Sequence, residues 1–110
     1  MNIVSPSRHD VLARRLGALA HPARLDILRH LAEADCCCCK DVVGRLDLAQ
    51  STVSQHLKVL VEAGLVRVVS DRQRSLYSVD RAAMGELGAA MTDMMRNCCA
   101  NERCSGNGEP

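Results

Sequence analysis

The stretch STVSQHLKVLVEA, residues 51–63, constrains the fold of this chain more than any other. Apolar Val53, Leu57 and Leu60 recur at i, i+4 and i+7, which is one stripe of a helix. Ser51 suits a helix N-cap, and Gly64 suits the stop just beyond the C-terminus. Polar residues fall on the opposite side: Ser51, Gln55, Lys58 and Glu62. A helix with short hydrogen-bonding side chains at its start can lie against a polar surface.

Two longer helices are predicted before this stretch. Ser7 can cap a helix from about Arg8 to Ala20, and the His21-Pro22 pair breaks it. A second helix then runs to about Ala34. The residues expected to face inward from these two helices are Leu12, Leu16, Leu19, Leu25, Leu28 and Leu31.

A junction at Asp35–Cys39 and a short helix at Lys40–Leu46 lead into the stretch. The short helix turns Val42, Val43 and Leu46 inward, and Asp47–Gln50 is a tight link to the next helix. Two helices with so short a join are the helix-turn-helix arrangement.

The pattern changes after Gly64. Residues 65–70 (LVRVVS) are rich in β-branched side chains, Asp71–Arg74 is a polar turn, and residues 75–79 (SLYSV) alternate polar and apolar positions. This pattern predicts a β-hairpin with a basic tip. Asp80 can then cap a last helix from Arg81 to about Asn97. The apolar stripe of that helix is formed by Met84, Leu87, Met91, and Met94 or Met95.

Length and composition favour a single small domain over residues 1–110, with loose N-terminal residues and a tail from about residue 100. The chain has one Tyr and neither Phe nor Trp, so an aliphatic helical core is expected. A core of this kind is marginal in a monomer, which favours self-association. We find no signal peptide and no stretch of membrane-spanning length, and we expect a cytoplasmic protein without a membrane partner.

The predicted order of elements is that of a winged helix-turn-helix, a mostly α fold with a β-hairpin wing. Such a fold binds double-stranded DNA by inserting its recognition helix into the major groove. Thr52 and Lys58 suit phosphate contacts, while Arg72 and Arg74 of the wing suit either the backbone or the minor groove. His56 is interpreted as a part-buried structural histidine. The residues expected to reach base edges are Gln50, Ser51, Ser54 and Gln55.

The segments LGALAHPARLDILRHL (residues 16–31) and LAQSTVSQHLKVLVEAGLVRVVSDRQRSLYSV (residues 48–79) resemble the ArsR/SmtB family of metal-responsive repressors. The resemblance covers roughly residues 8–95. It implies a homodimer joined by the first and last helices, binding to an imperfect inverted repeat in operator DNA, and release when a ligand binds. Some zinc-type members use Asp and His on the last helix, but this last helix has no His.

Seven cysteines are many for a cytosolic chain, and Cys98, Cys99 and Cys104 form the first candidate metal site. Three thiolates without His or carboxylate suit trivalent arsenic or antimony, whereas zinc prefers four tetrahedral ligands. The two adjacent thiols can converge if the helix unwinds there. The set also resembles the C-terminal cysteine site of some arsenic-responsive members. One packed thiol with two unrelated tail cysteines is the alternative.

The run Cys36–Cys39 is the second candidate, because many arsenic- and cadmium-type members carry a Cys-x-Cys pair here. Alignment on the SQHL segment puts Cys38 at the first position and Lys40 at the second, so the paired thiol is lost at that register. Idle thiols at a helix start, a secondary soft-metal site and a redox-sensitive spot all stay open.

The sequence therefore predicts a repressor of a metal-resistance operon that As(III) or Sb(III) releases from DNA. No pattern supports catalysis or an organic cofactor. Three alternatives remain: a repressor of the same fold with an oxidative or persulfide trigger, a Cd or Pb sensor, and a thiol-rich metal buffer without a DNA role.

Overall fold

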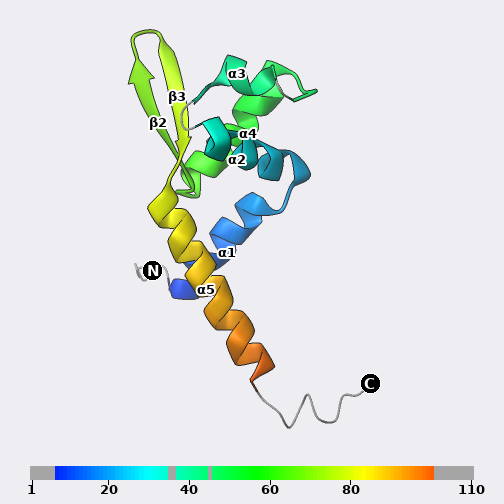
Figure 1. Cartoon of the computed structure of the whole chain (residues 1–110), viewed down its shortest axis with the longest axis vertical. Helices are drawn as coiled ribbons and strands as arrows, with labels where there is room; N and C mark the ends of the chain where they lie inside the picture. Colours follow the sequence, from blue (N-terminus) through cyan, green and yellow to red (C-terminus); the bar gives the residue numbers. More distant parts are fainter. Residues whose placement is uncertain (1–6, 35–36, 45, 101–110) are drawn as a thin grey trace, which may run out of the picture.

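The computed structural model describes residues 7–34, 37–44 and 46–100 (Figure 1). The order of its elements confirms the predicted winged helix-turn-helix, with β2 and β3 as the wing. No described helix is long and apolar enough to cross a membrane. The elements are α1 (Arg8–Leu19), α2 (Pro22–Ala34), β1 (Cys37–Cys38), α3 (Cys39–Val43), α4 (Gln50–Glu62), β2 (Val66–Asp71), β3 (Arg74–Val79) and α5 (Arg81–Cys99).

The predicted starts of α1 and α5 are confirmed by their caps. The Ser7 hydroxyl accepts a hydrogen bond from the Asp10 amide at 3.1 Å, and the Asp10 carboxylate accepts one from the Ser7 amide at 3.0 Å. The Asp80 carboxylate likewise accepts from the Ala83 amide at 3.0 Å. These bonds satisfy amides that have no partner inside the helix.

The core is aliphatic, as the composition predicts. Its largest fully buried side chains come from α2, α3, α4 and the link to β2: Ile27, Leu31, Val42, Val53, Leu57, Leu60 and Leu65. The predicted stripe of α4 is therefore confirmed. One prediction for α2 is wrong, because Leu25 is 52% exposed and Ile27 takes the inward position instead.

The sheet has a third strand that the sequence did not predict. β1 pairs antiparallel with β3, through Cys37 opposite Tyr77 and Cys38 opposite Leu76, and the strand order is β1-β3-β2. Part of the predicted junction at Asp35–Cys39 is thus a strand, while Asp35 and Cys36 lie outside the described residues. The short helix predicted over Lys40–Leu46 is α3, Cys39–Val43.

The ends of α4 and α5 also differ from the prediction. α4 begins at Gln50 after Ala49, so Ser51 lies within the first turn and is not the N-cap. Gly64 does end this helix, and its φ of +81° is the left-handed conformation that glycine adopts readily. α5 continues past the predicted Asn97 to Cys99.

The arrangement in Figure 1 separates the two functional parts expected from the sequence. α3, α4 and the tip of the wing lie toward one end of the molecule. α5 runs from the base of the wing past α1, and its C-terminal turns project at the other end.

Candidate DNA interface and thiol clusters

The predicted DNA-contacting side chains on α4 and the wing are accessible. All eight are exposed: Gln50, Ser51, Thr52, Ser54, Gln55, Lys58, Arg72 and Arg74. On α4, Ser51, Gln55 and Lys58 lie opposite the buried stripe of Val53, Leu57 and Leu60. The N-cap residue Ala49 makes no side-chain cap bond, so the first amides of α4 are available to a phosphate oxygen.

The wing ends in a two-residue loop, Arg72-Gln73, between the paired residues Asp71 and Arg74. Arg72 has a φ of +61°, which is uncommon for a residue with a side chain. The Arg74 guanidinium lies 3.4 Å from the Asp71 carboxylate, and both side chains are largely exposed. An exposed ion pair of this kind contributes little, so Arg74 is able to exchange Asp71 for a phosphate.

The recognition helix contacts the cysteine run directly, which the sequence did not predict. The Cys39 Sγ lies 3.5 Å from the Ser54 hydroxyl and 4.0 Å from the Gln50 carbonyl oxygen. Ser54 and Gln50 are two of the predicted base-contacting residues. The thiol at the start of α3 therefore lies against the first turns of α4.

The other two described thiols of the run have different neighbours. The buried Cys37 Sγ lies 3.8 Å from the Nε2 of the buried His30 in α2. The Asp41 carboxylate accepts hydrogen bonds from the Cys38 thiol and the Cys38 amide, both at 3.2 Å, and these bonds lower the pKa of Asp41. Three consecutive thiols thus point at three separate partners. Nothing in a run of identical residues indicates this divergence.

The C-terminal thiols lie on a helical turn. Cys98 and Cys99 are both exposed and both belong to α5, so the expected unwinding before Cys98 is absent. Successive helical side chains point about 100° apart. Cys98 lines an open groove of about 600 Å³ between the start of α1 and the end of α5, together with Ser7, Leu12, Ala90 and Met94. Cys104 lies outside the described residues.

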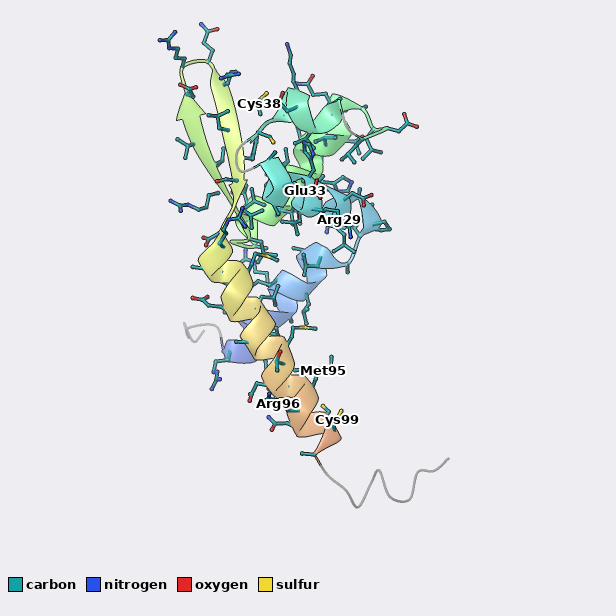
Figure 2. All side chains as sticks on the ribbon, in the orientation of Figure 1. Arg29, Glu33, Cys38, Met95, Arg96 and Cys99 are labelled. Carbon is teal, nitrogen blue, oxygen red and sulfur yellow. The ribbon has the colours of Figure 1, made fainter. Side chains whose placement is uncertain are left out.

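The two cysteine groups are well separated within one chain. Figure 2 shows Cys38 beside α3 and the wing, and Cys99 at the far end of α5. A disulfide needs its two Cα atoms within about 7 Å, so Cys38 and Cys99 of one protomer do not meet in this conformation. Within the described ranges no group of three His, Cys, Asp or Glu side chains is arranged to hold a metal ion.

His56 is half-buried, which agrees with its interpretation as a structural histidine. Its partner, Arg24 of α2, was not predicted, although it lies within the HPAR segment at the start of the second helix. A contact 32 residues apart has no signature in the local pattern.

Comparisons with known proteins agree with this architecture. A family model described as a helix-turn-helix domain matches residues 19–69. The arsenical resistance operon repressor of Staphylococcus aureus is 30% identical over 94 residues, which cover 82% of this chain and 89% of the relative.

Two solved structures show the same fold. An ArsR-like transcriptional regulator from Rhodococcus sp. RHA1 has a TM-score of 0.72 at 23% identity, covering 88% of this chain and 94% of that one. A homodimeric winged helix-turn-helix DNA-binding domain from Mycobacterium bovis has a TM-score of 0.66 at 22% identity, covering 89% and 94%.

Proposed function

The chain belongs to the ArsR/SmtB family of transcriptional regulators, and we propose that it is a homodimeric repressor released from its operator by As(III) or Sb(III). The observation that carries the proposal is the position of Cys98, on the last turn of α5 and in the groove against α1. A ligand on this thiol contacts the two helices that the family resemblance assigns to the dimer interface.

Apolar surface on the terminal helices supports the dimer. Val11 of α1 is 39% exposed and Met95 of α5 is 53% exposed, while Met91 and Met94 are only half-buried. The C-terminal turns of α5 project beyond the other elements (Figure 1). A second copy packed on α1 and α5 covers this surface, and the Mycobacterium bovis domain is itself homodimeric. Two recognition helices then face two half-sites of an inverted repeat.

The chemistry of the donors supports a soft, three-coordinate ligand. Cys98 and Cys99 offer two exposed thiols, and Cys104 is five residues beyond Cys99. The Staphylococcus aureus relative is named for arsenical resistance. Free thiols need a reducing compartment, so the proposal includes a cytoplasmic location.

Ligand binding has a physical route to α4. Two thiols about 100° apart on a helix converge on one atom only if the last turn of α5 changes conformation. α5 is tied to α1 by an ion pair of 3.2 Å between Glu86 and Arg15. Arg15 in turn lies beside Gly64 at the end of α4, within 3.9 Å of where a Cβ would be. A coupling of about 1–3 kcal/mol along this route is enough for release.

X-ray absorption spectroscopy at the arsenic edge tests the ligand set. The arsenite-loaded full chain is expected to show three sulfur neighbours per arsenic at one site per chain. A Cys36→Ser/Cys38→Ser variant should give the same spectrum, and a Cys98→Ser/Cys99→Ser variant should lose it. Oxygen-rich coordination, or a spectrum that survives loss of Cys98 and Cys99, contradicts the proposed site.

A thiol count separates the metalloid trigger from an oxidative one. DNA release by arsenite should leave the thiols unoxidised and reverse on addition of a dithiol chelator. If peroxide or polysulfide releases DNA with loss of thiols, and arsenite does not, the oxidative alternative replaces this proposal.

A further inference from the structure

Arg24 of α2 contacts both α1 and α4, and so links three helices. Its Nε donates a hydrogen bond to the Nδ1 of His56, in the middle of α4, at 3.2 Å. Its Nη1 lies 3.4 Å from the Gly17 carbonyl oxygen and 3.5 Å from that of Ala18, near the end of α1. A guanidinium with several planar donors suits such a bridge. The orientation of α4 relative to α1 and α2 thus depends in part on one acceptor atom, the His56 Nδ1.

A second imidazole packs on the first. The His21 ring, in the link between α1 and α2, lies with its centroid 4.5 Å from that of His56, and the ring planes are tilted by 56°. The His21 Nδ1 accepts a hydrogen bond from the Ala23 amide at 3.1 Å. Each histidine therefore uses an unprotonated Nδ1 as an acceptor, and protonation removes that acceptor.

The charges around His56 all oppose its protonation. Burial lowers the pKa of His56 below its ordinary value, and repulsion from His21, whenever that ring is protonated, and from the Arg24 guanidinium lowers it further. Within the described ranges no carboxylate raises the pKa of His56 against these effects. The elements α3 and β2 also pack on α4, but none of their charged side chains shifts the pKa of His56. At neutral pH His56 is uncharged and available to Arg24.

We propose that the Arg24–His56 contact is a proton-sensitive positioning contact for the recognition helix, so that mild acid weakens operator binding. The inference rests on the proposed DNA-binding function but not on the identity of the inducer. Protonation places a second N–H opposite the Arg24 Nε–H, next to the guanidinium charge. The hydrogen bond between α2 and α4 is then broken, and α4 no longer has its DNA-competent orientation.

The sign of the effect distinguishes this contact from ordinary histidine–phosphate attraction. DNA phosphates favour a protonated histidine, and on their own they raise affinity as the pH falls. Here the bound form requires neutral His56, so protons compete with DNA. Each unit by which the pKa of His56 differs between the bound and free protein changes affinity by about tenfold in acid.

Fluorescence anisotropy of the full chain tests the proposal. The probe is a labelled duplex selected by the wild-type protein from a random pool at pH 8, titrated between pH 8 and 5.5 at fixed ionic strength. Wild type should lose affinity in acid. His56→Asn keeps an acceptor that does not titrate, so it should bind at pH 8 and lose the acid-dependent decrease. His9→Asn, at an exposed histidine on α1, should keep that decrease.

A measurement on the wild type guards against misfolded variants. Imidazole nuclear magnetic resonance should show His56 as the Nε2–H tautomer, with a pKa below the ordinary histidine value, while circular dichroism shows the helices intact. An affinity that rises in acid, an equal decrease in His56→Asn, or a His56 pKa at or above the ordinary histidine value overturns the proposal. Absence of binding at pH 8 overturns the proposed DNA-binding function instead.

Discussion

At the residue scale, Ser54 has two expected roles: it is a candidate base-contacting residue, and it also packs against a cysteine of α3. Its exposed side chain faces the space where DNA is expected, and its hydroxyl lies 3.5 Å from the Cys39 thiol. A serine that is part of the protein's own packing has fewer orientations open to it than a free one. Base contact and packing are therefore linked at this position.

Substitutions on α4 should separate base contacts from phosphate contacts. Ser54→Ala or Gln55→Ala should reduce discrimination at one base pair of the operator by about 1–3 kcal/mol, the usual value of a well-formed hydrogen-bonded pairing with a base edge. Lys58→Ala should weaken binding to all sequences. It should also reduce the slope of log affinity against log salt concentration by about one. Competition binding against single-base operator variants measures both. Uniform weakening by Gln55→Ala would show that this residue does not read bases.

Asp41 provides a prediction on pH and stability. The hydrogen bonds from Cys38 lower its pKa, so the stabilisation is present above the ordinary carboxyl pKa and is lost as the pH falls through the lowered value. At pH 7, Asp41→Asn should unfold at a lower urea concentration than wild type. The difference between the two unfolding midpoints should shrink in acid. Asp47→Asn, at an exposed carboxylate before α4, is the matched control and should follow wild type.

At the element scale, the sequence predicted what short-range patterns determine. The helices were predicted from the 3.6-residue periodicity and the caps, and the wing was predicted from β-branched residues on both sides of a polar turn. β1 was missed because two cysteines have no period, and their pairing with Tyr77 and Leu76 depends on a strand about forty residues away. Serine is a preferred cap, but the chain begins α4 one residue before Ser51, where the turn ends.

Replacing each of the two wing arginines should reduce DNA affinity by a different amount. Arg72→Ala and Arg74→Ala should each weaken binding to all duplexes and flatten the salt dependence. Arg74 is paired with Asp71 in the free protein, so its loss should cost less than that of Arg72. Affinity measured at several salt concentrations gives the slopes. If the wild type and Arg72→Ala bind DNA with equal affinity, the tip of the wing is not part of the DNA interface.

At the scale of the whole molecule, the predicted interface and the predicted thiol site are at opposite ends (Figure 2). The sequence predicted both sets of residues, because recognition-helix polarity and cysteine clustering are local features. It did not predict the contacts that join the helices in between, since Arg15–Glu86 and Arg24–His56 join residues 71 and 32 positions apart. Long-range contacts of this kind are set by tertiary packing.

The proposed dimer makes a prediction about two exposed apolar residues. Met95→Glu, on the projecting part of α5, should shift the protein toward monomer, because a carboxylate buried in an apolar interface is costly. Val69→Glu, on the wing and 58% exposed, is the matched control and should remain dimeric. Sedimentation equilibrium measures the association constant. A dimeric Met95→Glu protein would place the interface elsewhere.

The central claim is that thiols at the end of α5 control DNA binding by α4. Its most direct test is an arsenite titration of the operator-bound full chain, followed by anisotropy, for wild type and for Cys98→Ser/Cys99→Ser/Cys104→Ser. Cys36→Ser/Cys38→Ser is the control. Wild type and the control should release DNA at similar arsenite, and the triple variant should stay bound. Release of the triple variant at the wild-type arsenite concentration would contradict the account.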